Sequence, residues 1–215
     1  MNKIIVNNNE HIIINQDSVN LNLNDNHKIT IFDQSLKSLK IKVGNNAEVI
    51  INDFRIITQE KTDIEFIIDE GAKLTFNHAF INVNNYDLKI KANLKNNKGN
   101  IIINIHGFNQ GTNNIQIDGI IGLKKIKNEL LENIKIINSD RGKCEVIPNM
   151  LISNNEVIAN HYVTIGKINE EELAYLMSKG INEEKCEKLI INGFLIKVID
   201  DQDLLIKIKE ILQRR

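Results

Sequence analysis

The sequence is poor in several residue types, and each shortage excludes a class of protein. Two cysteines in 215 residues, Cys144 and Cys186, cannot form a disulfide framework, and neither has a second cysteine at metal-ligand spacing. The formal net charge of -1 lacks the basic excess of proteins that bind nucleic acid or anionic lipid. No apolar run reaches the length of a membrane span or of a signal peptide's apolar region. We therefore expect a soluble cytoplasmic protein that binds neither nucleic acid nor a membrane.

Residues that favour helices are also scarce, because 42 isoleucines and 34 asparagines load the chain with a strand former and a turn former. Up to about residue 165, apolar and polar residues alternate in short runs whose centres lie roughly ten residues apart. Examples are Ile29 and Ile31; Leu39, Ile41 and Val43; Ile64, Phe66 and Ile68; Ile101, Ile103 and Ile105; Ile115 and Ile117. This spacing is typical of an all-β sandwich, barrel or solenoid. The long interval from Gly122 to Leu131 is expected to hold an irregular loop or a short helical turn.

Two details favour a solenoid over the other all-β folds. The stretches around Ala47 and Ala72 share a turn, a small residue and an alternating strand, and the two alanines are 25 residues apart. That separation suits one coil of short strands, and stacked coils would align asparagines into ladders at the corners. Asn-Gly, which marks tight hairpins, occurs only at Asn192-Gly193, inside a helical pattern. We predict a right-handed parallel β-helix over residues 1–167.

The periodicity changes to that of helices at about residue 168. Asn169 and Asn182 can each cap a helix, and Asp200 or Asp201 can start a third one that runs to the carboxyl terminus. The sequence thus predicts a small helical domain over residues 168–215.

Motifs that would indicate an enzyme are missing. The chain contains no GxGxxG, no GxxxxGK[ST] and no GxSxG motif. Its histidines stand apart from one another and from any Cys or carboxylate at zinc-site spacing, so most are interpreted as surface or strand residues. They are His11, His27, His78, His106 and His161. The carboxylate pairs Asp69-Glu70 and Asp200-Asp201 coincide with turn or cap signals, so we expect no catalytic activity.

The two cysteines have different surroundings. Cys144 follows Arg141 and Lys143, and nearby cations could lower the pKa of its thiol and make it a reactive thiolate or a soft-metal ligand. The alternative is a strand cysteine without a function. Cys186 lies on the apolar face of an expected helix, where cysteine acts as a small hydrophobic residue.

One segment carries a dense motif. From Pro148 the chain continues through Ala159-Asn160-His161 and Gly166 to Ser178-Lys179-Gly180-Ile181, and then to Gly193-Phe194 at the end of a helical pattern. This arrangement resembles the carboxy-terminal signature of the SufB/SufD family. The resemblance implies a parallel β-helix core, a helical carboxy-terminal domain that docks a SufC-like ABC ATPase through residues 169–215, and a scaffold role in iron-sulfur cluster assembly.

Departures from the family pattern refine this expectation. The SufB branch carries an acceptor cysteine where Ile147 stands in this register, so the chain is more similar to the SufD branch, as a shortened member. The resemblance then implies pairing with a SufB-like subunit through the β-helix and makes His161 the candidate cluster ligand. It implies no cofactor in the isolated chain and a transient iron-sulfur cluster only in the assembled complex. Tyr162, which replaces a small or acidic residue, could close that site.

Other interpretations remain open from the sequence. The chain could pair with itself as a homodimeric minimal scaffold, and His161 could simply anchor the passage from strand to helix. A bactofilin-like self-assembling β-helix protein would need no terminal helices. A polysaccharide lyase or hydrolase with a β-helix would need a cluster of Asp, Arg or Lys on one face, which the sequence does not show.

Overall fold

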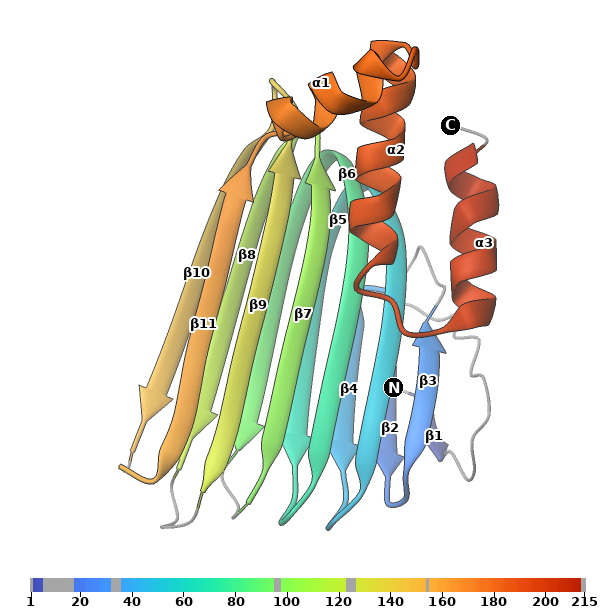
Figure 1. The fold of residues 1–215 in the computed structure, drawn as a ribbon. Coiled ribbons are helices and arrows are strands. Elements are labelled where there is room, and N and C mark those ends of the chain that lie inside the picture. Colours follow the sequence, from blue (N-terminus) through green and yellow to red (C-terminus); the bar gives the residue numbers. More distant parts are fainter. Residues whose placement is uncertain are drawn as a thin grey trace.

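The computed structural model describes residues 2–5, 18–31, 36–94, 98–122, 127–153 and 155–213. These residues form a parallel β-helix followed by three helices, as the sequence predicted (Figure 1). The strands are β1 (Asn2–Ile5), β2 (Ser18–Leu23), β3 (His27–Ile31), β4 (Ser38–Val43), β5 (Glu48–Ile68), β6 (Lys73–Leu94), β7 (Asn100–Asn109), β8 (Thr112–Ile121), β9 (Asn128–Asn138), β10 (Lys143–Ile152) and β11 (Val157–Gly166).

The coils stack so that each strand pairs in parallel with the strand one coil away. The first halves of β5 and β6 line up with β3, β7, β9 and β11 on one face, and their second halves line up with β4, β8 and β10 on the other. Glu48 pairs with Lys73, and the Lys73 amide donates to the Ala47 carbonyl at 2.9 Å. The 25-residue spacing of Ala47 and Ala72 is therefore the length of one coil.

Apolar side chains at every second position of the strands fill the interior of the β-helix. Odd-numbered residues of β7 and even-numbered residues of β9, which are register partners, point inward, where apolar burial stabilises the stack by roughly 1.5–3 kcal/mol for each large side chain. Ile51, Phe76 and Ile103 lie in direct register on successive coils and are all fully buried.

Asparagine ladders join successive coils, one on the outer face of the strands and one at a corner of the coils, where the sequence predicted them. In one ladder the Asn133 amide donates to Asn104 at 2.9 Å, Asn104 donates to Asn77 at 2.9 Å, and Asn77 donates to Asn52 at 3.1 Å. A second ladder joins Asn82, Asn109 and Asn138 at a corner of the coils. Because each amide both donates and accepts, the ladders satisfy polar groups that stacking would otherwise bury unpaired.

The terminal helices are α1 (Glu170–Ser178), α2 (Glu183–Ile196) and α3 (Gln202–Gln213). Their predicted caps are confirmed: Asn169, Asn182 and Asp201 each accept hydrogen bonds from backbone amides of the first turn. Gly180 follows α1 with φ of 84°, a left-handed conformation that ends the helix. None of the described helices combines the length and the apolar character needed to span a bilayer.

Helices α2 and α3 lie against the face that contains the first halves of β5 and β6 (Figure 1). They form a second apolar core there, which consists of Phe54, Ala79, Ile81, Leu195, Ile199, Leu204, Ile208 and Leu212. The ring of His106 stacks on Phe194 at 4.5 Å and its Nδ1 lies 2.7 Å from the Phe194 carbonyl oxygen. The carboxy-terminal helices are therefore fixed to the β-helix.

The structure also locates the predicted loop and the histidines. The interval from Gly122 to Leu131 is shorter than predicted, because β9 already begins at Asn128; residues 123–126 lie outside the described part. Of the histidines, His27, His78, His106 and His161 lie in strands as expected, and His11 falls outside the described residues.

Candidate functional site

The last coil, formed by β10 and β11, has nothing stacked on it among the described residues. β10 pairs only with β8 and β11 only with β9, so the outer edge of each strand is left without a neighbour there. The coil therefore exposes large apolar side chains. They are Ile147, Leu151, Ile152, Ile158, Tyr162, Val163 and Ile165. We call this edge, residues 143–153 and 155–166, the terminal coil.

His161 belongs to an inward column of the β-helix. It is in register with Glu132 of β9, which is in register with Ile103 of β7, and the column continues through Phe76 to Ile51. Register partners in parallel strands point to the same side, and Val157 and Ala159 on the same face of β11 pack against the core. His161 therefore points toward the mouth of the β-helix and is exposed only because no coil covers it.

Glu132 is the unusual member of this column. Its side chain is fully buried, and neither carboxylate oxygen has a hydrogen-bond partner. Burial, and to a lesser extent the negative charge of Asp118, raise the pKa of Glu132 to about 8. Gly119, on the opposite strand β8, faces this side chain: a Cβ there would lie at an ordinary contact distance of 3.8 Å from Oε1 of Glu132, but only 2.4 Å from Cδ2 of Leu130, so the missing Cβ makes room for Leu130. The mouth thus contains an acid and an imidazole in adjacent coils.

A second polar group lies deep inside the β-helix. Arg55 Nε donates to Asp53 at 2.9 Å, its Nη1 donates to the Leu36 carbonyl at 2.8 Å, and His78 Nδ1 lies 3.0 Å from the same carboxylate. His78 Nε2 lies 3.2 Å from the Tyr86 hydroxyl, and all four side chains are fully buried. We call these four residues the internal network.

The pKa values in the internal network follow from burial and pairing. Burial alone would raise the pKa of Asp53, but Arg55 and His78 outweigh it and hold that pKa below its ordinary value. Burial lowers the pKa of His78 and raises that of Tyr86. The network therefore holds one ion pair with a neutral imidazole and a neutral phenol.

The comparisons with known proteins agree with this architecture. Residues 34–194 match the family described as SUF system FeS cluster assembly, SufBD core domain. This chain belongs to the SufBD core-domain family. The match includes the internal network and the terminal coil, and extends through α1 to Phe194 in α2.

Individual SufBD proteins match over shorter stretches. A SufBD family protein of Pyrococcus horikoshii is 38% identical over 80 residues, which are 36% of this chain and 18% of the relative. The Bacillus subtilis SufD protein is 34% identical over 70 residues (33% of this chain and 16% of SufD), and SufB of the same organism is 35% identical over 60 residues (28% and 13%). The chain thus matches less than a fifth of the length of these relatives, and SufB and SufD are about equally similar to it.

Tyr162 does not enter the mouth of this SufBD chain. It pairs with Asn133, whose amide belongs to the outer ladder, so its ring lies on the outer face of β11 and is 59% exposed. Successive residues of a strand point to opposite faces, which puts Tyr162 on the side away from His161. The expectation that its phenol could close the site is wrong for this geometry.

Cys144 does not have the activated thiol that its sequence neighbours suggested. Its side chain points inward from β10 and packs against the core, whereas Lys143 projects to the other face. Burial raises the pKa of the Cys144 thiol to about 11, and the Asn113 amide lies 3.7 Å from its sulfur. Cys186 is fully buried in α2, as expected.

Cys144 and His161 are too far apart to bind the same metal ion or cluster. Cys144 pairs with Asn113, whereas the β8 residue opposite Glu132 is Gly119, six positions further along the strand. At about 3.3 Å per residue, this separation is roughly 20 Å. Among the described residues, no three His, Cys, Asp or Glu side chains are grouped so that they could hold a metal ion.

The raised pKa predicts that Cys144 is unreactive. At pH 8 we expect its alkylation by iodoacetamide in the folded protein to be about a hundredfold slower than that of a free cysteine, because the thiolate is the nucleophile. Mass spectrometry of the Cys186→Ala variant, with and without denaturant, measures the rate at Cys144 alone. A rate in the folded protein equal to that in denaturant would contradict the buried position.

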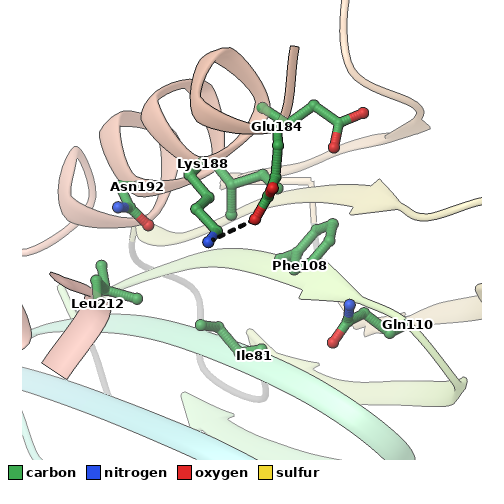
Figure 2. Close-up of a pocket in the computed structure, with 9 residues that line it drawn as sticks. Ile81, Phe108, Gln110, Glu184, Lys188, Asn192 and Leu212 are labelled. Carbon is green, nitrogen blue, oxygen red and sulfur yellow. Dashed lines mark ion pairs between the residues drawn. The ribbon is translucent and has the colours of Figure 1, made fainter. Parts of the chain in front are cut away.

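A pocket of about 310 Å³ lies between the helices and the β-helix (Figure 2). Its floor contains Ile81 and Phe108, and Lys188 and Glu184 of α2 form an ion pair of 2.9 Å at its side. No residue that lines it comes from the terminal coil. The pocket is a gap in the packing of α2 and α3 on the sheet, and it does not contain the groups of the mouth.

Sequence reasoning missed both Glu132 and the internal network. The signal for Glu132 was present in the alternation of Leu130, Glu132, Ile134 and Ile136, which places an acid at an inward position. It was hidden because this stretch adjoins the interval interpreted as a loop.

Proposed function

We propose that this chain is a SufD-like scaffold subunit of a cytoplasmic iron-sulfur cluster assembly complex, without catalytic activity of its own. The observation that carries the proposal is the open terminal coil, which lies within the SufBD core domain and combines an unpaired sheet edge with exposed apolar side chains. Unpaired strand edges readily accept another strand, and exposed apolar patches mark interaction sites.

The partner that best fits this edge is a SufB-like subunit. A strand added beside β10 or β11 would satisfy the free backbone groups and cover Leu151 and Ile158, which are 62% and 57% exposed. Such a junction would enclose the mouth of the β-helix between the two subunits. Pairing with a second copy of this chain would use the same edge and is an outcome of the test below.

The cluster itself is the cargo of this junction. His161 supplies a neutral imidazole, which is a competent ligand of iron in iron-sulfur centres. Cys144 cannot supply a thiolate to the same cluster, because it lies far from His161 along the coil. The thiolates would therefore come from the SufB-like partner, and the cluster would form only in the assembled complex.

The carboxy-terminal helices are the proposed docking site for a SufC-like ABC ATPase. Helix α1 has no buried residue, and its Tyr175 and Met177 are 62% and 43% exposed. Because α2 and α3 are packed on the sheet, a movement imposed on these helices would be transmitted to the β-helix. The same packing argues against a bactofilin-like filament protein, which would not need these helices.

Co-expression with a SufB-like subunit tests the pairing. We expect Ile158→Asp to abolish co-purification of the two subunits, because an aspartate would be desolvated in the interface. Ile206→Asp, on α3, is the matched control, since Ile206 is also 57% exposed and lies outside the terminal coil. Pairing that survives Ile158→Asp would overturn this assignment, and a complex that contains only copies of this chain would replace it with a homodimer.

Removal of all residues after 168 is not a clean test of ATPase docking, because it would expose Phe54, Ala79 and Ile81. Tyr175→Ala is the better variant and should weaken binding of the ATPase while leaving subunit pairing unchanged. Tyr162→Ala, at a similarly exposed tyrosine of the terminal coil, should leave ATPase binding unchanged. ATPase binding that is unaffected by Tyr175→Ala would show that α1 is not the docking surface.

Reconstitution of the full complex with iron and sulfide tests the role of His161. We expect His161→Ala to lower the visible absorbance of the cluster without affecting complex formation. Equal cluster content in wild type and variant would return His161 to a structural role at the start of the passage to α1.

A further inference from the structure

We propose that Glu132 and His161 together form a binding site for a single divalent transition-metal ion, held by this chain alone at the mouth of the β-helix. This inference rests on the proposed function only in assigning His161 to metal binding. It adds a second ligand, one coil deeper, and a bound species that does not require a partner.

The geometry places the two side chains on one ion. Glu132 and His161 are register partners on adjacent parallel strands and point to the same side. Such strands lie about 4.8 Å apart, and ligand bonds from carboxylate oxygen and imidazole nitrogen to a divalent metal are about 2 Å long. Both side chains can therefore reach an ion between them without a change of the backbone.

The surroundings of Glu132 point to a missing cation. In this column every deeper member is apolar, namely Ile103, Phe76 and Ile51, and all of them are fully buried. Glu132 interrupts them with a carboxyl group that has no hydrogen-bond partner for either oxygen. A buried carboxylate without a partner is costly, and a bound cation would offset that cost directly.

The access is also present. Gly119 of the opposite strand carries no side chain, and the position that its Cβ would take lies at contact distance from Oε1 of Glu132 (3.8 Å) and is occupied by Cδ2 of Leu130 (2.4 Å). Met150, the register partner of Gly119, lies one coil further out and belongs to the same open terminal coil as His161. An ion can enter from this end, since no further coil covers it among the described residues.

The donor set selects the class of ion. One carboxylate and one imidazole suit Fe²⁺, Co²⁺ or Zn²⁺, whereas Mg²⁺ and Ca²⁺ prefer oxygen ligands alone. Two protein ligands leave coordination positions for water, which partner thiolates could later replace. The chain would thus hold one Fe²⁺ ion before the second subunit joins.

Titration of the isolated full-length chain with Co²⁺ tests the proposal. Cobalt replaces Fe²⁺ without oxidation in air, and its visible absorption reports coordination by the protein. We expect one Co²⁺ per wild-type chain, and an affinity at least about tenfold weaker for Glu132→Gln and for His161→Ala. Glu129→Gln is the matched control, because Glu129 lies on the same strand but on the outer face, and it should bind like wild type. Unchanged far-ultraviolet circular dichroism checks that each variant is folded.

The outcomes separate this inference from the proposed function. Absence of Co²⁺ binding in the wild type, or equal affinity in wild type and Glu132→Gln, would overturn the two-ligand site even if His161→Ala still lowers cluster content in the assembled complex. Conversely, loss of Co²⁺ binding in Glu132→Gln together with a normal cluster in the His161→Ala complex would support this site and reject the cluster role of His161. A Co²⁺-dependent rise in the unfolding temperature of wild type that is absent in Glu132→Gln would support the site independently.

Discussion

Replacement of Asp53 by alanine is expected to lower the free energy of unfolding by about 3–5 kcal/mol, because it leaves the buried Arg55 guanidinium without its counterion. Arg55 is fully buried in the interior of the β-helix, so water cannot replace the lost carboxylate. In the wild type its Nε donates to both oxygens of Asp53. Two further hydrogen-bond partners of Arg55, the Leu36 carbonyl and the Thr62 hydroxyl, are neutral, and the charge of Glu60 contributes less to the pKa of Arg55 than that of Asp53 does. Urea denaturation followed by circular dichroism measures the effect.

A double variant distinguishes the charge from the packing. Asp53→Ala combined with Arg55→Met removes both charges, so it should recover much of the stability that the single variant loses. Asp140→Ala, which breaks the exposed ion pair with Lys167, is the surface control and should change stability little. If the single and double variants were equally unstable, the ion pair would not be the reason for the loss.

Replacement of Glu132 by glutamine is expected to stabilise the protein at alkaline pH. The pKa of Glu132 is raised from its ordinary value of 4.5 to about 8 in the folded chain, so the native state binds this proton more tightly than the unfolded state. The associated stability is fully present below pH 4.5, falls as the pH rises from 4.5 to about 8, and does not fall further above that. Glutamine carries no charge, so above pH 8 the variant should be more stable than the wild type by on the order of 4 kcal/mol.

The pH dependence is the informative part of this experiment. At pH 4 both proteins carry an uncharged side chain at position 132 and should have nearly equal free energies of unfolding. The measurement needs metal-free buffer, because a bound cation would stabilise only the wild type. The charged neighbour that contributes to the raised pKa is Asp118, and Asp118→Asn should lower the pKa of Glu132 slightly. A stability difference independent of pH would show that the side chain is not buried as described.

The sequence by itself determined the class of fold and the ends of its helices. Alternation of apolar residues and the 25-residue spacing of Ala47 and Ala72 indicated stacked coils, and the structure has that register. The caps at Asn169, Asn182 and Asp201 were predictable as well. These features are local, because a strand, a coil length or a cap is specified by residues close together in the chain.

Only the tertiary structure decided which side chains share a column. Successive coils differ in length, since Glu48 pairs with Lys73, Lys73 with Asn100, and Asn100 with Glu129, so the offset grows from 25 to 27 and then to 29 residues. An error of one residue turns a side chain to the opposite face. This register makes Glu132 the neighbour of His161 on the adjacent strand. It also brings His78 to the Asp53–Arg55 ion pair. The pKa of Cys144 is likewise raised because strands that are remote in the sequence bury its thiol. The cationic residues next to it in the sequence suggested a lowered pKa instead.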